Sequence, residues 1–221
     1  MSNIGTVGVV GAGQMGNGIA HVCALAGYDV FLNDVSEDAL EQGMKTIEAN
    51  MSRQVSRSMI SPDDMTTALK RIQPGTSLEP FGKVDLAIEA ATEKREVKEA
   101  IFKSLCDVVP ERTYLATNTS SISITRLAAT TDRPEKFIGL HFMNPVPLMK
   151  LMEVIRGLAT DQDTYEMALG FAKALGKTTT NAEDYPAFIV NRVLVPMINE
   201  AVYALYEGVG TVESIDTAMK L

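Results

Sequence analysis

The fold of this chain is decided by a short stretch near its front, which reads Thr6-Val7-Gly8-Val9-Val10-Gly11-Ala12-Gly13-Gln14-Met15-Gly16. Its first half is a short apolar run, typical of a buried parallel strand. Its second half matches the pattern GxGxxG, and apolar residues recur at helical spacing from Met15 to Ala26. Glycine clusters also make ordinary turns, but a strand before this one and a helix after it indicate a dinucleotide-binding loop.

Each glycine of the pattern has a separate expected role. Gly11 makes the tight turn, Gly13 lets a pyrophosphate approach the backbone, and Gly16 lets the helix pack closely on the strand. Gln14 and Met15 open the helix, whose N-terminus is expected to face the phosphates. The sequence therefore predicts a dinucleotide site at residues 11–16.

Asp34 follows the next apolar run, eighteen residues after Gly16. A carboxylate at this place accepts hydrogen bonds from the adenosine ribose hydroxyls and repels a 2′-phosphate. No arginine follows it, so NAD is favoured over NADP. The alternative is that Asp34 only forms a turn before Ser36, which is a good helix cap.

Strands and helices continue to alternate along the chain. We expect further strands at 30–32, 84–89, 114–118, 137–142, 151–155 and 178–181. Helices are expected at 36–58, from 61 onward, and at 94–109, 122–129 and 163–175. This βαβ series predicts an α/β protein with a Rossmann-type doubly wound sheet.

The pattern changes after Pro186, where only helices are expected, at 188–206 and 212–221. We place a domain boundary near Asp184, with the dinucleotide-binding domain at 1–184. Residues 185–221 are then the start of an all-helical C-terminal domain. Because the pattern stops inside a helix, we expect this second domain to be truncated.

The composition limits the partners. The net charge of −8 and the pI near 4.9 argue against nucleic acid. Loop amides and helix dipoles still allow a phosphate-bearing ligand. Cys23 and Cys106 stand apart, which indicates reduced thiols and predicts neither a disulfide framework nor a metal site. We expect no membrane span and no targeting segment, and hence a cytoplasmic protein.

One of the two histidines is a candidate catalytic base. His141 ends an apolar strand, and ligands of doubly wound sheets bind outside the carboxyl ends of strands. Glu153 lies twelve residues later in a strand so apolar that an unpaired carboxylate there would be costly. We expect a pair in which Glu153 fixes the imidazole tautomer. The alternatives are a structural or solvated histidine and a Glu153 that faces solvent on an edge strand. His21, in mid-helix, is interpreted as structural.

Two further polar positions are candidates for substrate contacts. Ser120 lies in Asn118-Thr119-Ser120-Ser121, after another strand, and offers a hydroxyl donor. Asn191 lies among apolar residues of the first late helix, where it can reach a cleft between the domains. The alternatives are helix capping by the serines and a surface position for Asn191.

These motifs together resemble the L-3-hydroxyacyl-CoA dehydrogenase family, above all its bacterial 3-hydroxybutyryl-CoA dehydrogenases. The resemblance runs from Thr6 to Leu221. It is carried by the glycine loop, Asn118-Thr119-Ser120-Ser121, His141-Phe142-Met143-Asn144-Pro145, Lys150-Leu151-Met152-Glu153-Val154, Phe188-Ile189-Val190-Asn191-Arg192 and Ile215-Asp216-Thr217-Ala218-Met219-Lys220-Leu221.

The resemblance implies a role for each matching residue. His141 removes the 3-hydroxyl proton of an acyl-CoA, Glu153 orients it, and Ser120 and Asn191 hold the substrate oxygens. It also implies that Glu93, Lys98 and Asn144 line the nicotinamide half of NAD, that Asp34 holds the adenosine ribose, and that Asn50 and Arg57 contact CoA. The implied assembly is a homodimer formed through the helical domain. Met143 and Ala187 depart from the family, which usually has Phe and Gly there.

Two rival functions come from different classes. A dehydrogenase of free 3-hydroxyacids is expected to use a catalytic lysine, and the spacing of His141 and Glu153 argues against it. A catalytically inactive NAD-binding structural or regulatory protein would keep the fold. The intact set of His141, Glu153, Ser120 and Asn191 argues against that second rival.

Overall fold

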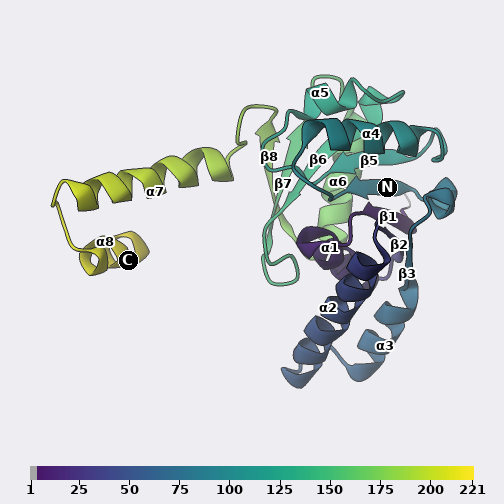
Figure 1. Cartoon of the computed structure of the whole chain (residues 1–221), viewed down its shortest axis with the longest axis horizontal. Coiled ribbons are helices and arrows are strands. Elements are labelled where there is room, and N and C mark those ends of the chain that lie inside the picture. Colours follow the sequence, from purple (N-terminus) through teal and green to yellow (C-terminus); the bar gives the residue numbers. More distant parts are fainter. Residues whose placement is uncertain (1–3) are drawn as a thin grey trace.

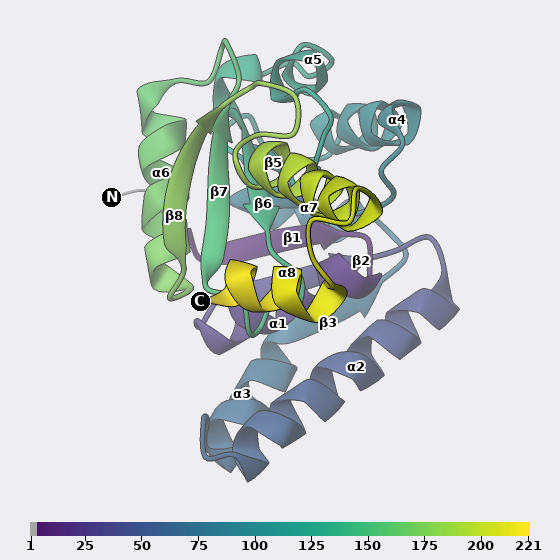
Figure 2. The ribbon, with the colours of Figure 1, turned by 90° about the vertical axis from the view of Figure 1, so that its left-hand side faces the viewer.

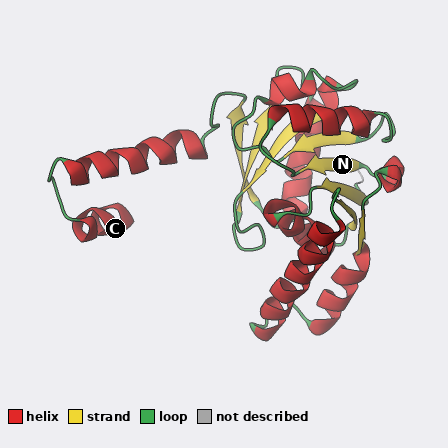
Figure 3. Cartoon of the chain, in the orientation of Figure 1, coloured by secondary structure: helices red, strands yellow, loops and turns green. Residues whose placement is uncertain are grey.

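The computed structural model describes residues 4–221 and is built around one eight-stranded sheet (Figures 1 and 3). The order across the sheet is β3-β2-β1-β4-β5-β6-β7-β8. The strands are β1 (Thr6–Val10), β2 (Asp29–Asn33), β3 (Ile72–Gly75), β4 (Leu86–Glu89), β5 (Tyr114–Thr117), β6 (Phe137–Phe142), β7 (Leu151–Arg156) and β8 (Thr178–Glu183). Neighbouring strands are parallel except β6 and β7, which form an antiparallel pair.

Helices cover both faces of the sheet, as a doubly wound fold requires. The α-helices are α1 (Gln14–Leu25), α2 (Glu37–Ser56), α3 (Pro62–Arg71), α4 (Arg95–Cys106), α5 (Ile124–Ala128), α6 (Gln162–Ala174), α7 (Val190–Tyr206) and α8 (Val212–Lys220). Two 3₁₀ turns, η1 (Glu79–Lys83) and η2 (Pro134–Lys136), complete the set. The expected alternation of strands and helices is confirmed.

Two apolar cores hold the layers together. The larger packs α1, α2 and α6 on one face, through side chains such as Ile19, Ile47 and Phe171. The smaller packs α4 and α5 on the other face, around Phe102 and Leu127. Burial of this kind contributes about 25 cal/mol per Å² of apolar area, which makes it the main stabilising term. α2 and α3 project beyond the sheet as a helical arm (Figure 1).

Several details of the fold differ from the sequence-based expectation; α4, for example, ends at Cys106 and not at residue 109. β3 was not predicted because Pro74 and Gly75 have the composition of a turn, but it pairs only with β2 at the sheet edge, where proline is tolerated. β8 extends two residues further than expected, to Glu183. α5 is shorter than predicted. α7 begins at Val190 rather than at Phe188, because the two residues before Ile189 have positive φ angles.

β7 lies in the interior of the sheet, between β6 and β8. Glu153 is therefore not on an edge strand, and its side chain is fully buried. The alternative that this carboxylate faces solvent is excluded.

α7 and α8 extend away from the sheet (Figure 1), so in the view of Figure 2 they lie in front of it. Among the described residues, neither helix has a buried side chain. Large apolar side chains, such as Val193, Val202 and Tyr206, are exposed along α7. Within residues 4–221, no helix combines the length and apolarity needed to cross a membrane.

Candidate active site

The glycine loop has the geometry that the sequence predicts. Gly11 has a φ of +103°, and its N–H donates to the carbonyl oxygen of Asn33 at 2.7 Å. A Cβ on Gly16 would lie 1.7 Å from the carbonyl oxygen of Gly11, so only glycine fits there. Gly13 has open space above it, with no heavy atom within 4 Å of a Cβ position. The loop is therefore tightly packed against the protein at Gly16 and leaves free space for a ligand at Gly13.

The cleft beside this loop fits a dinucleotide. α1 has no side chain capping its N-terminus, so its first amide groups are available to a pyrophosphate. Asp34 is held at the rim by the N–H of Ala12, at 2.8 Å, and by the N–H of Ser36, at 3.1 Å. The adjoining cavity of about 520 Å³ is lined by Gly13, Gln14 and the start of α2. We call this cavity the dinucleotide cleft.

His141 and Glu153 form the expected pair. They lie opposite each other on the antiparallel strands β6 and β7, and His141 Nδ1 is 2.7 Å from Glu153 Oε2. Glu153 is fully buried and His141 is nearly so. With Nδ1 engaged by the carboxylate, Nε2 is the ring nitrogen left for a substrate.

The second oxygen of Glu153 connects the pair to α7. Glu153 Oε1 accepts hydrogen bonds from the N–H groups of Ile189 and Val190, each at 3.0 Å. Ala187 and Phe188 have φ angles of +68° and +52°, which non-glycine residues seldom adopt, and they turn these amides toward the carboxylate. The Phe188 ring packs 5.8 Å from the His141 ring, centroid to centroid. The start of α7 is thus part of the site.

Glu93 organises the loop after β5. Its Oε1 accepts hydrogen bonds from the Thr119 hydroxyl at 2.6 Å and from the N–H and hydroxyl of Ser120 at 2.8 and 3.1 Å. Burial alone would raise the pKa of Glu93, but these hydrogen bonds and the charge of Lys98 outweigh burial and hold the pKa below its ordinary value. Glu93 is therefore an anion that holds Ser120 in place.

Lys98 lies deeper than the sequence reasoning expected. Its side chain is 1% exposed, and Nζ donates to both oxygens of Glu89 at 2.7 Å. Nζ also lies 3.4 Å from Glu93 Oε2. Lys98 thus lies beneath Glu93 and supports it, and Lys98 is not among the residues that line the neighbouring cavities.

The remaining site residues surround one cavity. Ser120, His141, Asn144 and Asn191 line a space of about 380 Å³, together with Glu93. Asn191 Nδ2 donates to the Ser120 carbonyl oxygen at 3.5 Å, so the half-buried Asn191 faces this cavity. We call this space the catalytic cavity.

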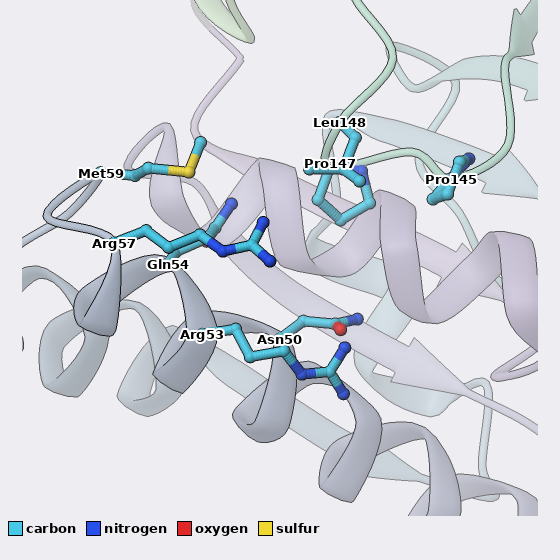
Figure 4. A pocket seen from close by; sticks show the side chains of 8 residues that line it. All are labelled: Asn50, Arg53, Gln54, Arg57, Met59, Pro145, Pro147 and Leu148. Carbon is cyan, nitrogen blue, oxygen red and sulfur yellow. The ribbon is translucent and has the colours of Figure 1, made fainter.

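A second group of residues lies in the C-terminal part of α2 and just after it. Asn50, Arg53 and Gln54 of α2, with Arg57 at its C-cap, face the connection between β6 and β7 across a pocket of about 250 Å³ (Figure 4). We call it the arginine pocket. It brings together Asn50 and Arg57, which the sequence analysis named, and adds Arg53, which it missed.

The comparisons with known proteins agree with this geometry. Residues 6–185 match the family model described as the NAD binding domain of 3-hydroxyacyl-CoA dehydrogenase, and residues 188–221 match the C-terminal domain of the same enzyme. The chain belongs to the 3-hydroxyacyl-CoA dehydrogenase family. Its cofactor is NAD, as the sequence predicts.

Individual relatives support the same family. The chain is 61% identical to a 3-hydroxybutyryl-CoA dehydrogenase of Bradyrhizobium diazoefficiens, over 97% of this chain and 73% of that protein. It is 42% identical to the human mitochondrial hydroxyacyl-coenzyme A dehydrogenase, over 97% of this chain and 70% of the relative. The crystal structure of (S)-3-hydroxybutyryl-CoA dehydrogenase from Ralstonia eutropha superposes with a TM-score of 0.96, at 46% identity, covering 99% of this chain and 77% of that one.

Two further buried polar residues support the fold: Glu89, which the sequence analysis missed, and His21, which it interpreted as structural. Glu89 ends β4 and is fully buried, with hydrogen bonds from Lys98, from the Thr117 hydroxyl at 2.7 Å and from the N–H of Ala91 at 2.8 Å. His21 is buried with Nε2 3.0 Å from Gln54 Oε1, in keeping with its structural interpretation. Glu89 carries the same signal as Glu153, a carboxylate in an apolar strand.

Proposed function

We propose that this protein interconverts an L-3-hydroxyacyl-CoA and the matching 3-ketoacyl-CoA, and that its substrate is 3-hydroxybutyryl-CoA. The observation that carries the proposal is the buried His141–Glu153 pair beside an NAD cleft. The names of the relatives support the substrate, since the Bradyrhizobium diazoefficiens and Ralstonia eutropha proteins are both 3-hydroxybutyryl-CoA dehydrogenases.

His141 acts as the general base. Glu153 Oε2 accepts a hydrogen bond from the Nδ1–H group, which leaves the unprotonated Nε2 free to take the proton of the 3-hydroxyl group. The buried carboxylate also stabilises the imidazolium that forms, because opposite charges interact more strongly away from water. The glycine loop, Asp34, Glu93 and Asn144 would hold NAD, which would supply reversible hydride transfer at C3.

Ser120 and Asn191 hold the reacting oxygen. Both line the catalytic cavity with His141, and Glu93 fixes the backbone of Ser120. With substrate bound, the Ser120 hydroxyl turns its one proton from Glu93 to the reacting oxygen, and the Asn191 amide donates to the same oxygen. These hydrogen bonds strengthen as the oxygen becomes a carbonyl, which favours the transition state electrostatically. Glu93 and Asn144, with Lys98 behind Glu93, complete the nicotinamide side of the site.

The CoA portion is assigned to the arginine pocket. Arg57 and Arg53 place two cations beside Asn50, and no ion pair engages either arginine among the described residues. Guanidinium groups bind phosphate through paired N–H donors. This pocket suits the phosphate-rich end of an acyl-CoA, with the acyl end toward His141.

Residues 185–221 are proposed to belong to a helical domain that forms a homodimer. The support is the exposed apolar surface of α7, including Val193, Val195 and Val202, which water disfavours. We also propose a cytoplasmic location, which suits the unpaired Cys23 and Cys106.

The substitution His141→Gln tests the proposed function. It removes the base but keeps a polar side chain of similar reach. We expect NADH binding, measured by fluorescence titration, to be unchanged, while turnover with acetoacetyl-CoA falls by about 10³-fold or more. Full activity in the variant would contradict the proposal.

A further inference from the structure

The connection between β6 and β7, residues 143–150, forms a wall that the three cavities share. We call it the hairpin loop. Asn144 lines the catalytic cavity and the dinucleotide cleft. Pro145 and Pro147 line the dinucleotide cleft and also the arginine pocket. The position of this segment therefore sets the shape of the NAD side and of the CoA side together.

Two side-chain anchors hold the hairpin loop, whose last residue, Lys150, also accepts the Thr178 N–H at 2.8 Å. In the first, Val146 is buried against Gly18 of α1, where an added Cβ would lie 2.9 Å from Val146 Cβ. In the second, Lys177 Nζ, just beyond α6, donates to the carbonyl oxygens of Val146 at 2.6 Å and Met149 at 2.7 Å. The Leu148 and Met149 side chains are 59% and 42% exposed, so apolar packing does not fix this end of the loop.

Lys177 is an unusual residue for a surface turn. Its ammonium group donates hydrogen bonds to backbone carbonyl oxygens, and no carboxylate pairs with it in the part of the chain that the structure describes. Burial lowers the pKa of Lys177. Moving a cation partly out of water is costly unless its hydrogen bonds are replaced, and the two carbonyl groups replace them.

We propose that Lys177 is a positioning residue that holds the hairpin loop in the place where it receives both NAD and the acyl-CoA. The inference rests on the proposed function, because the loop matters only to a protein that binds both ligands. His141 and Glu153 are fixed by the pairing of β6 with β7 and not by the loop. Loosening the loop therefore weakens binding and leaves the chemical step largely intact.

The test compares Lys177→Met with Lys173→Met. The first removes both hydrogen bonds, and the second removes one exposed lysine near the end of α6. We expect Lys177→Met to raise the Kd of NADH and the Kd of acetyl-CoA by about tenfold, measured by titration. The kcat with acetoacetyl-CoA should fall by less than about threefold, and Lys177→Arg should recover most of the binding.

A second variant approaches the loop from its other anchor. Gly18→Ala pushes Val146 outward while Lys177 stays intact, and it should produce the same pattern of weakened binding and preserved kcat. If Lys177→Met does not yield folded protein, Gly18→Ala becomes the test of whether the hairpin loop controls the binding of both ligands. Unchanged Kd values for NADH and acetyl-CoA in Gly18→Ala would then overturn the proposal.

Two results with folded Lys177→Met would also overturn it. One is a pair of Kd values equal to those of Lys173→Met. The other is a loss of kcat as large as the loss of binding, with no recovery in Lys177→Arg. A wild-type protein that binds both ligands without turnover would contradict the proposed function, and the titrations would still test Lys177.

Discussion

Replacing Glu153 with glutamine should switch the catalytic histidine to the wrong tautomer. The side chain is fully buried, and its two oxygens have different partners. Oε2 faces His141 Nδ1 at 2.7 Å, while Oε1 accepts the N–H groups of Ile189 and Val190 at 3.0 Å. Glutamine keeps the shape but has only one oxygen.

The two α7 amides decide how that glutamine sits. If its oxygen turned toward His141, its NH₂ group would face both amides, and two hydrogen bonds of about 1 kcal/mol each would be lost. The oxygen therefore stays with the amides, and the NH₂ donates to His141 Nδ1. The ring proton then moves to Nε2, where the substrate hydroxyl needs an acceptor. An asparagine at the equivalent place in a serine protease triad lowers kcat by about 10⁴ for this reason.

We expect Glu153→Gln to lower kcat by about 10³–10⁴-fold, equivalent to about 4–5 kcal/mol of barrier. The assay is NADH oxidation with acetoacetyl-CoA, alongside a fluorescence titration of NADH, which should be unchanged. Glu183→Gln, on the exposed side of the neighbouring strand β8, is the matched control and should retain wild-type kcat. A kcat for Glu153→Gln within tenfold of wild type would refute the tautomer argument.

Three further substitutions test other parts of the structure. Asp34→Asn should weaken NADH binding about tenfold and narrow the preference over NADPH, because the repelling charge is gone. Lys98→Met should lower the free energy of unfolding by about 3–5 kcal/mol, measured in urea, because it leaves the Glu89 carboxylate buried without its cation. Asp184→Asn should be destabilising near neutral pH. Burial tends to raise the pKa of Asp184, but hydrogen bonds from Ser123 and the start of α5 hold it below its ordinary value.

The sign of the Asp184 effect follows from linkage. A depressed folded-state pKa adds stability that is complete above the unfolded-state pKa and is lost as the pH falls through the folded-state pKa. The gap between wild type and Asp184→Asn should therefore shrink as urea titrations move from neutral to acidic pH. A stability difference between wild type and Asp184→Asn that grows at acidic pH would contradict the Asp184 argument. A loss of less than about 1 kcal/mol in the free energy of unfolding of Lys98→Met would contradict the Lys98 argument. An unaltered preference for NADH over NADPH in Asp34→Asn would contradict the role of Asp34.

The sequence predicted the parts of the site that follow local rules. The glycine pattern after a strand gave the NAD loop, because backbone conformation and helix dipoles are local properties. The His141–Glu153 pair was predictable because a carboxylate in an apolar strand needs a partner. Glu89 ends the apolar strand β4, so the same rule applies to it and would have predicted a buried partner.

Other parts depend on tertiary structure and could not be read from the chain. Lys98 was placed on the cleft by resemblance, whereas its depth depends on the burial of Glu89 beneath it. Glu153 accepts a hydrogen bond from the backbone N–H of Ile189, which lies 36 positions later in the chain. Every residue type except proline carries such an N–H group, so the sequence does not indicate this contact. Lys177 follows a helix-ending glycine and has the pattern of an ordinary exposed turn, so its hold on the hairpin loop appears only in three dimensions.

The most direct test of the central claim is to mix the protein with acetoacetyl-CoA and follow oxidation of NADH and, separately, of NADPH. The account predicts oxidation of NADH that is much faster than oxidation of NADPH, and little reaction when free acetoacetate replaces the CoA ester. NADH that binds at the cleft without being oxidised would contradict the proposed reaction, and a preference for NADPH would contradict the role of Asp34.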